Sequence, residues 1–486
     1  MCSWAIIKAR IVFGALLISA LLALPAARGA ATPAQRPNVI FILVDDMGYG
    51  DLGCYGSRQY KTPNIDRLAA EGVRFTQYYS SSPICSPSRV SLTTGQYHAR
   101  WRINSYIDNR AANERRGMAQ WLDLKAPALA RTLKSAGYRT AHVGKWHMGG
   151  GRDVGEAPLI TEYGFDQSLT QFEGLGDRIQ PTFDTMFEKQ PHRAHPLGNR
   201  SAELGRGKVE FVKRYEVNQR YVSTAIDFIR SAQKARQPFY LNLWTDDPHS
   251  PWEPSPANRG DGSPAAMYKG VVEELDASLA PLLDLVRNDE ALKNNTLIVF
   301  ASDNGFEGSI TNPSGLRGHK GTLYEGGIRD PLIVCWPGGQ DPAVAGKADE
   351  QTLIAGMDFA PTVLALTNVP ASHGTKFDGI DRGEAFKGIA SSQPRAQPIF
   401  WNRPPDRPGP GGDFPDFAVR EGRWKLLIEE DGSKPQLYDV QADPLEKQNL
   451  ADAQPQRVKE LSRKIAQWRQ TMPPMLPPPA QTRADE

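Results

Sequence analysis

Three nearly continuous apolar runs stand out along the chain, at residues 38–44, 239–244 and 296–302. Such unbroken apolar runs are typical of strands that are buried on both faces. Acidic or polar residues follow each run. Between them, apolar residues recur at helical spacing, which predicts helices over residues 64–71, 128–136, 217–235 and 265–286. This alternation predicts an α/β fold with a large mixed, mostly parallel sheet sandwiched by helices, whose strand ends gather ligands at one edge.

The composition changes near residues 391–415, which are rich in Pro, Gly and Arg. Beyond this segment, short apolar runs and one helical pattern predict a small antiparallel sheet with a single packing helix. We therefore expect a large domain over residues 36–395, a C-terminal α+β subdomain with an antiparallel sheet over 396–472, and a Pro-rich disordered tail over 473–486.

Residues 1–29 have the pattern of a secretory signal peptide. Lys8 and Arg10 form a basic start, residues 11–24 are almost entirely apolar, and small residues suited to cleavage follow. An uncleaved signal anchor is the alternative. The apolar run is too short to span a bilayer comfortably, and no later segment approaches the required length. We expect an exported protein, periplasmic or secreted, without a transmembrane anchor after cleavage.

Charge and cysteine content narrow the classes of function. The net charge is +2, and cleavage after residue 29 would remove three basic residues and no acidic one, leaving −1. A global basic field for nucleic acid is therefore not supported. Three cysteines would remain, too few for a disulfide scaffold. Cys335 lies in an apolar run and is expected to be a buried free thiol, although pairing with Cys54 stays open.

Two acidic pairs close the predicted core strands. Asp45 and Asp46 follow the first strand, and Asp303 and Asn304 follow a later one. Carboxylate and amide oxygens are hard donors suited to Ca²⁺ or Mg²⁺. A single Asp after a strand more often forms a turn or caps a helix. Two such pairs on core strands, beside an oxidisable cysteine in another loop, predict a metal site.

Basic residues lie in three glycine- or proline-containing segments that adjoin predicted strands. They are Lys145 and His147 in one segment, His249 in the second and Lys320 in the third. Each by itself is more often a solvated or structural residue. Together they are able to surround a centre at which a negatively charged group is transferred.

The residues from Cys85 to Arg89 read Cys-Ser-Pro-Ser-Arg, and Thr94-Gly95 ends the same segment. This Cys-x-Pro-x-Arg core closely resembles the signature of the formylglycine-dependent sulfatases, a branch of the alkaline phosphatase superfamily. The acidic pairs and the basic segments match that family's motifs in the same order, from about residue 37 to residue 450.

The resemblance implies an alkaline phosphatase-like fold and a sulfuric ester hydrolase. A formylglycine-generating maturation enzyme would convert Cys85 to 3-oxoalanine (formylglycine), whose hydrate is the nucleophile. By the same resemblance Arg89 steadies the hydrate and His147 is the base that lets sulfate leave. The resemblance also implies that the sulfate oxygens are bound by Lys145, His249 and Lys320. It implies a metal ion, Ca²⁺ with Mg²⁺ as the alternative, that is held by position 85 and by Asp45, Asp46, Asp303 and Asn304.

The substrate is less defined. Arg100 and Arg102 begin an arginine-dense region that could line a pocket for an acidic or multiply sulfated sugar, or form a solvated basic face. Asp246 and Asp247 precede the His249 motif where many relatives carry small or apolar residues, which could reshape the pocket. We expect a sulfated carbohydrate, because an exported hydrolase meets polymers. The alternatives are a phosphodiesterase or phosphonate monoester hydrolase on the same fold, and a non-catalytic sulfated-glycan-binding protein with Cys85 unoxidised.

Overall fold

The computed structural model describes residues 36–185, 193–310, 312–389, 395–406 and 414–477. The predicted signal peptide lies outside these ranges. A central sheet has the strand order β12-β2-β11-β10-β1-β9-β4-β5. In chain order its strands are β1 (Asn38–Val44), β2 (Val73–Phe75), β4 (Arg139–Gly144), β5 (Gln167–Leu169), β9 (Phe239–Trp244), β10 (Thr296–Ser302), β11 (Leu332–Cys335) and β12 (Lys347–Asp349).

The three apolar runs are the central strands of this sheet. β1 runs parallel to both β9 and β10, and its residues are all buried. Alternate residues of β1 join two different hydrophobic cores: Phe41 belongs to one and Ile42 to the other. A strand with both faces covered needs apolar residues at every position, which explains the unbroken pattern. Within this central sheet, as far as the structure describes it, only β11 pairs in antiparallel fashion with its neighbours on both sides, so the predicted mixed, mostly parallel sheet is confirmed.

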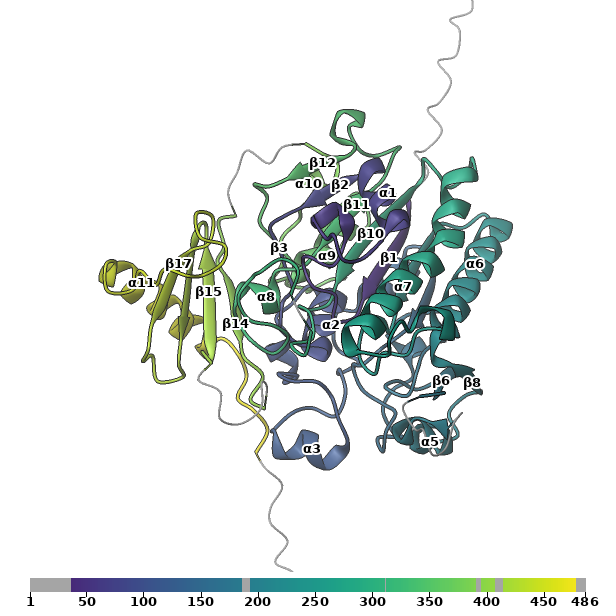
Figure 1. Ribbon diagram of the computed structural model, residues 1–486, viewed down its shortest axis with the longest axis horizontal. Coiled ribbons are helices and arrows are strands. Elements are labelled where there is room, and N and C mark those ends of the chain that lie inside the picture. The colour runs from purple at the N-terminus through teal and green to yellow at the C-terminus, as the bar shows by residue number, and fades with distance from the viewer. Residues whose placement is uncertain (1–35, 186–192, 311, 390–394, 407–413, 478–486) are drawn as a thin grey trace, which may run out of the picture. The chain divides into compact units, whose positions relative to one another are not determined.

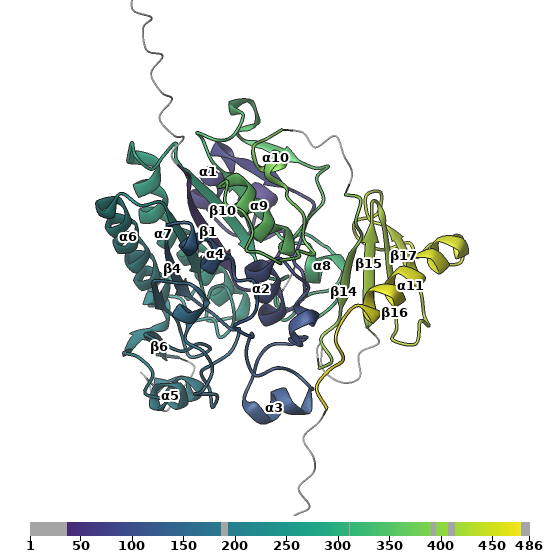
Figure 2. The ribbon, with the colours of Figure 1, turned by 180° about the vertical axis from the view of Figure 1, so that it is seen from behind.

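Helices cover both faces of the sheet (Figures 1 and 2). One core contains residues of α1 (Pro63–Glu71), α6 (Val217–Ala235) and α7 (Pro264–Asn288), and α6 packs directly on α7. The other core contains residues of α2 (Cys85–Thr94), α4 (Leu129–Ser135), α9 (Phe359–Leu366) and α10 (Gly383–Phe386). The four helices predicted from apolar spacing are α1, α4, α6 and α7, each within two residues of the expected ends.

The C-terminal residues form the predicted antiparallel sheet and helix. The strand order is β14 (Ile399–Asn402), β15 (Phe417–Glu421), β16 (Trp424–Ile428) and β17 (Gln436–Asp439), and α11 (Pro455–Gln470) packs on β15 and β16. The sequence did not predict β14. Residues 473–477 of the expected tail are described, and Leu476 donates a backbone hydrogen bond to Gly117. Residues 478–486 lie outside the described ranges.

The segment between β5 and α6 adds a smaller three-stranded sheet, in the order β7-β6-β8. The elements of this segment are β6 (Arg178–Phe183), β7 (Arg193–Ala194), α5 (Pro196–Glu203) and β8 (Val209–Lys213). Elsewhere in the chain, short helices and strands are β3 (Tyr78–Tyr79), α3 (Arg110–Arg115), α8 (Glu325–Ile328) and β13 (Ile354–Ala355). Sequence periodicity had not predicted this sheet.

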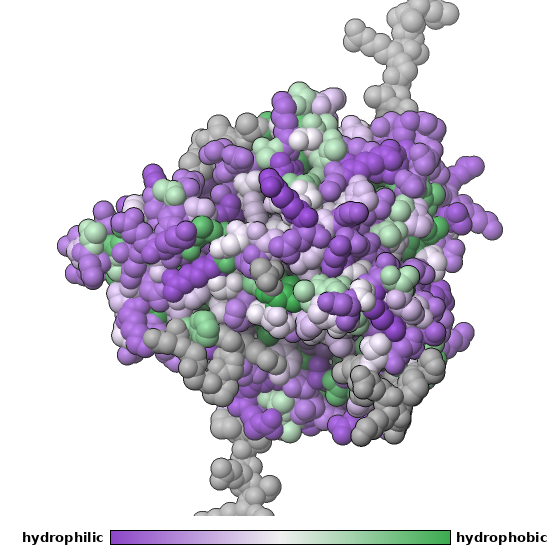
Figure 3. Space-filling model, viewed as in Figure 1, coloured by the Kyte–Doolittle hydropathy of each residue, from purple (hydrophilic) through white to green (hydrophobic). Residues whose placement is uncertain are grey.

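The surface of the protein is largely hydrophilic, and the cysteines within the described ranges are unpaired. The face shown in Figure 3 is mostly hydrophilic, with small scattered apolar spots. None of the helices described here combines the length and apolar character needed to cross a bilayer. Cys54, Cys85 and Cys335 are all free thiols, and Cys335 is buried, as expected.

Candidate active site

The register of the central strands gathers the motif residues at one edge of the sheet. Val44 of β1 pairs with Ser302 of β10, so the acidic residues that follow each strand become neighbours. β9 and β4 end beside them and lead into the segments of His249 and Lys145. A cavity of about 520 Å³ lies at this edge. Its walls include six residues that the sequence had singled out: Asp45, Cys85, Lys145, His147, His249 and Lys320.

Cys85 is the first residue of α2, which begins after an extended Ile84. Its side chain lines the cavity but is buried, with 2% exposure. Burial first, and the charge of Asp45 second, raise the pKa of the Cys85 thiol well above its ordinary value. A thiol that stays protonated is a poor nucleophile. The unmodified side chain is therefore unsuited to act as a thiolate nucleophile.

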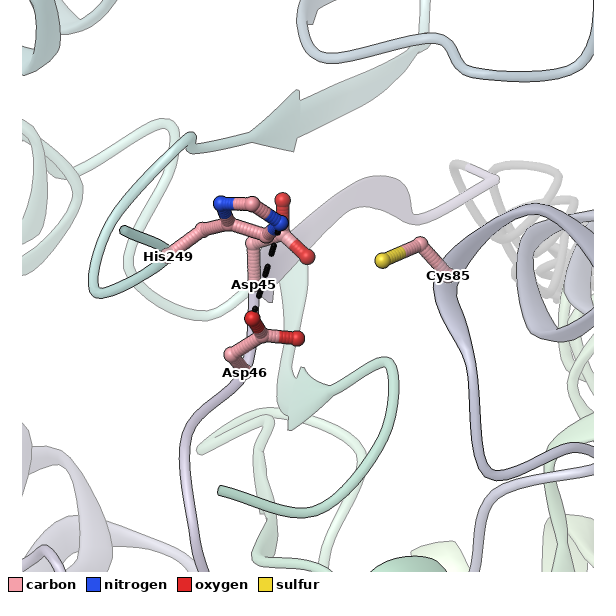
Figure 4. A group of neighbouring side chains, drawn as sticks. All are labelled: Asp45, Asp46, Cys85 and His249. Carbon is pink, nitrogen blue, oxygen red and sulfur yellow. Dashed lines mark ion pairs between the residues drawn. The ribbon is translucent and has the colours of Figure 1, made fainter. Parts of the chain in front are cut away.

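The acidic residues meet Cys85 across a short gap. Ligand atoms of Asp45, Asp46, Cys85 and His249 all lie within 4.8 Å of one another. Figure 4 shows the Cys85 sulfur pointing toward the two carboxylates and the histidine ring. One buried carboxylate oxygen of Asp45 accepts no hydrogen bond from any described residue. An orphaned buried oxygen of this kind suits a bound cation.

Asp303 and Asn304 adjoin this group rather than belong to it. The backbone N–H of Asp46 donates to Asp303 Oδ1 at 3.3 Å, and Asn304 Nδ2 donates to Asp46 Oδ1 at 2.8 Å. The Asn304 side-chain oxygen is buried and also lacks a partner among the described residues. Burial, and then the charge of Asp45, raise the pKa of Asp303 to about 7. Crowded carboxylates with spare oxygens are the donor set that a hard divalent cation needs.

Arg89 joins the acidic cluster to the helix that carries Cys85. It lies one helical turn after Cys85, on the same side of α2. Its guanidinium donates from Nε to Asp303 Oδ2 and from Nη1 to the Lys145 carbonyl, each at 2.8 Å, and its Nη2 lies 2.8 Å from the same Asp303 oxygen as an ion pair. The side chain has no exposure, so this fork fixes α2 relative to both loops.

The lysines and His249 point into the same space from three loops. Lys145 Nζ lies 2.5 Å from Asp45 Oδ2 and 3.9 Å from Cys85 Sγ. Lys320 Nζ lies 2.6 Å from Asp46 Oδ2, and His249 Nε2 lies 3.6 Å from the same oxygen. For Asp45, burial raises the pKa, but the charges of these three groups and of Arg89 outweigh burial and hold the pKa well below its ordinary value.

Sequence reasoning missed a carboxylate beside His147. Glu173 Oε2 lies 3.2 Å from His147 Nδ1 and 3.4 Å from Lys145 Nζ, and the other ring nitrogen of His147 lies 3.0 Å from the Ile107 carbonyl. A neutral imidazole satisfies only one of these two acceptors, whereas a protonated ring satisfies both. Burial is the largest influence and lowers the pKa of His147, while Glu173 opposes it. Glu173 stands in a loop without any motif, so no signal in the sequence could have found it.

The two acidic residues before His249 have separate surroundings. Asp247 is buried and pairs with Arg214 and Asn218. Asp246 lines the cavity, accepts a hydrogen bond from Tyr221 Oη at 3.3 Å, and keeps its other oxygen buried without a partner among the described residues. Burial raises the pKa of Asp246 to about 7.

The structure does not bring Arg100 and Arg102 to the cavity. Arg100 forms a two-pronged ion pair with Asp378, at 2.7 Å for each bond, and Arg102 Nε donates to the Pro474 carbonyl at 2.9 Å. Neither residue lines the space beside Cys85. Their contacts tie the segment after α2 to distant parts of the chain.

Comparison with known proteins gives consistent matches. A family model described as Sulfatase matches residues 37–369, and another, described as N-sulphoglucosamine sulphohydrolase, C-terminal, matches residues 318–471. Arylsulfatase A of Homo sapiens is 32% identical over 465 residues, which cover 89% of this chain and 86% of that protein. N-acetylgalactosamine-6-sulfatase of Canis lupus familiaris is 35% identical over 392 residues, covering 77% and 70%. The solved structure of Ps i-CgsB in complex with k-i-k-neocarrahexaose has a TM-score of 0.72 at 26% identity, covering 89% of this chain and 93% of that one.

Proposed function

The chain belongs to the sulfatase family, and we propose that it hydrolyses a sulfate monoester of a carbohydrate through a nucleophile made from Cys85. One observation carries the mechanism: Cys85 begins a helix at the floor of a cavity, with two carboxylates and a histidine within 4.8 Å and a lysine ammonium 3.9 Å from its sulfur. The sulfur marks where the modified side chain would carry its oxygens.

Modification of Cys85 to formylglycine supplies a chemistry that an ordinary hydroxyl lacks. A serine would be left as a stable sulfate ester after attacking sulfur. An aldehyde hydrate carries a second hydroxyl, and deprotonating that hydroxyl regenerates the carbonyl and expels sulfate without attack by water. Since Cys85 is 2% exposed in the folded chain, we propose that the maturation enzyme acts before folding, before or during export.

We propose Ca²⁺, with Mg²⁺ as the alternative, as the cation held by Asp45, Asp46, Asp303, Asn304 and the modified side chain. When bound, such an ion lowers the pKa of a coordinated hydroxyl and neutralises sulfate oxygens. The orphaned oxygens of Asp45 and Asn304 fit this role.

Lysine and histidine side chains of the cavity would bind the sulfate oxygens and transfer the protons of the reaction. Lys145 and Lys320 face the cavity and are suited to hold the sulfate oxygens as the S–O bond to the hydrate forms and the bond to the alcohol breaks. His249 or Lys320 would give a proton to the departing alcohol oxygen. His147 would take the hydrate proton, and its two acceptors, Glu173 and the Ile107 carbonyl, would stabilise the resulting imidazolium.

A carbohydrate substrate is supported by the relatives. One similar protein is named for N-acetylgalactosamine 6-sulfate, and one similar structure holds a neocarrahexaose. We extend only the class, a sulfated sugar, to this chain. Export stays a prediction from the N-terminal pattern.

Two measurements on protein from the native host test the proposal. Mass spectrometry of the Cys85 peptide should show the aldehyde or its hydrate, and a retained thiol would reject the mechanism and favour a non-catalytic glycan-binding protein. Sulfate release should then be screened over defined sulfated mono- and disaccharides. Faster turnover of 4-nitrophenyl phosphate esters than of 4-nitrophenyl sulfate would favour the phosphodiesterase or phosphonate hydrolase alternative.

A further inference from the structure

The arginines of the cavity wall are already neutralised. Arg152 pairs through Nη1 with Asp108 and through Nη2 with Glu173, at 2.7 Å in each case. Arg214 pairs with the buried Asp247. None of these carboxylates belongs to the proposed metal site, so a bound cation would not release either arginine.

The lysines differ in this respect. Lys145 and Lys320 have as their nearest partners Asp45 and Asp46, which are proposed metal ligands. A divalent cation at those carboxylates would compete for the same oxygens, which would free Lys320 and leave Lys145 with only its longer contact to Glu173, at 3.4 Å, so that both ammonium groups could face an anion. The cavity therefore has cations for one sulfate, and every other Lys or Arg that lines it among the described residues is engaged by its own carboxylate.

Two further carboxyl groups line the cavity without a direct ion pair among the described residues. Asp246 and Glu307 form no ion pair with a described residue, and each has one buried oxygen that accepts no hydrogen bond. Ionised, they repel a second anion, and protonated, they still add no positive charge. In either state they suit the hydroxyl groups of a sugar rather than a carboxylate or another sulfate.

The remaining wall offers a flat apolar surface and a neutral donor. His195 stacks on Phe172, with ring centroids 5.3 Å apart and planes 3° apart, and both line the cavity. His195 Nδ1 accepts a hydrogen bond from the Leu197 backbone at 3.2 Å, which places the proton of the neutral ring on Nε2. Burial lowers the pKa of His195, so the ring is a neutral donor at neutral pH.

We propose that the substrate is an otherwise uncharged sugar that carries the single reacting sulfate, and that Asp246 and Glu307 select against a second sulfate or a uronic acid in the cavity. The inference rests on the proposed function. It runs against one of the two alternatives left open for Arg100 and Arg102, a pocket for an acidic or multiply sulfated sugar, because the structure places both arginines elsewhere.

The test compares matched substrates in the metal-loaded, modified enzyme. For the position that is hydrolysed, kcat/KM is measured on a monosulfated galactose or N-acetylgalactosamine, on the same sugar with a second sulfate, and on the same sugar linked to glucuronic acid. Each added negative charge should lower kcat/KM by about tenfold, which corresponds to about 1.4 kcal/mol. Equal rates, or faster turnover of the more highly charged sugar, would overturn the inference.

Two variants identify the groups responsible. Glu307→Gln and Asp246→Asn should each raise the rate on the disulfated sugar relative to the monosulfated one by about three- to tenfold, because each removes a negative charge from the wall. Glu290→Gln is the matched control, since that side chain is 82% exposed on another surface and should leave the ratio unchanged. A ratio that moves equally in all three variants contradicts the assignment.

Binding separates this inference from the proposed function. The metal-loaded Cys85→Ala protein is titrated calorimetrically with the same sugars. If no sulfated sugar is hydrolysed by the modified enzyme, the proposed function fails, but tighter binding of the monosulfated sugar still supports the inference. Tighter binding of the more highly charged sugar, or no difference in affinity, rejects it.

Discussion

Replacing Lys425 by methionine tests how the C-terminal sheet supports the active site. Lys425 of β16 lies between two carboxylates, 2.9 Å from Glu325 Oε1 at the start of α8 and 3.0 Å from Glu446 Oε1, and none of the three side chains is exposed. Lys320 precedes α8 by a few residues. Before Lys320, Arg317 donates to Tyr438 Oη at 2.8 Å. The C-terminal sheet therefore holds the Lys320 segment at both ends.

The size of the effect follows from burial. Removing one member of a buried ion pair typically costs about 3–5 kcal/mol, because the partner stays behind as an uncompensated charge. Glu325 keeps a hydrogen bond from Tyr79 Oη at 2.6 Å and an ion pair with Arg329 at 3.4 Å. Burial already raises the pKa of Glu446 to about 7, so this group can take up a proton when its cation is lost. We therefore expect the lower end of the range, about 3 kcal/mol at pH 8.

The assay is urea unfolding followed by tryptophan fluorescence, with steady-state kinetics under conditions where the variant is folded. Lys425→Met should lower the unfolding midpoint and raise KM for the sulfate ester more than it lowers kcat, because a looser Lys320 segment weakens the grip on sulfate. The double variant Lys425→Met/Glu446→Gln removes one of the stranded charges and should recover about 1–2 kcal/mol. A loss below about 1 kcal/mol, or a double variant less stable than the single one, would refute this reasoning.

Further predictions concern the nucleophile, the metal and pH. Cys85→Ala should abolish sulfate release with an unchanged circular dichroism spectrum, and appreciable residual activity would contradict the covalent mechanism. Asp303→Ala should lower calcium stoichiometry or affinity and leave Arg89 without its main partner, whereas unchanged calcium binding would argue against Asp303 as a ligand. Burial raises the pKa of Glu446 from 4.5 to about 7, so the folded protein holds a proton that the unfolded chain has released between these values. Stability should therefore fall by up to about 3 kcal/mol as pH rises from about 4.5 to 7, and Glu446→Gln should remove this decline in pH-dependent unfolding; a decline that persists in the variant would point to another group.

The part of the site that sequence predicted is the part fixed by strand register. Buried parallel strands need apolar residues on both faces, so their limits can be seen in the sequence, and the polar residues that follow must meet at one edge. That is how Asp45, Asp303, Lys145 and His249 come together. Cys85 was found by its motif, because periodicity alone did not predict the helix that it begins.

The parts that sequence did not predict depend on contacts between distant residues. The partner of Arg100 is Asp378, which lies 278 residues further along the chain, so the composition of the arginine-dense region could not show that its charge was already paired. Glu173 is recognisable only from its distance to His147. In the small sheet between β5 and α6, β6 contains a proline, which argues against a strand in the sequence, and β7 has only two residues; β14 is only four residues long.

The two lysines of the site are positioned in different ways, one by the register of the central sheet and the other by contacts with residues far along the chain. Lys145 follows β4 directly, and its backbone N–H donates to the Trp244 carbonyl at 2.8 Å, so its position is set by the same sheet that folds the protein. Lys320 is held by residues such as Arg317 and Glu325, whose partners lie in the C-terminal sheet, 121 and 100 residues later in the chain. A change in the C-terminal sheet can therefore displace Lys320 while the carboxylates and Cys85 stay in place. Such a change should lower the affinity for the sulfate ester and leave metal binding unchanged. This result would show that the C-terminal sheet positions Lys320 for sulfate binding, whereas a C-terminal sheet that only adds stability would leave the affinity unchanged.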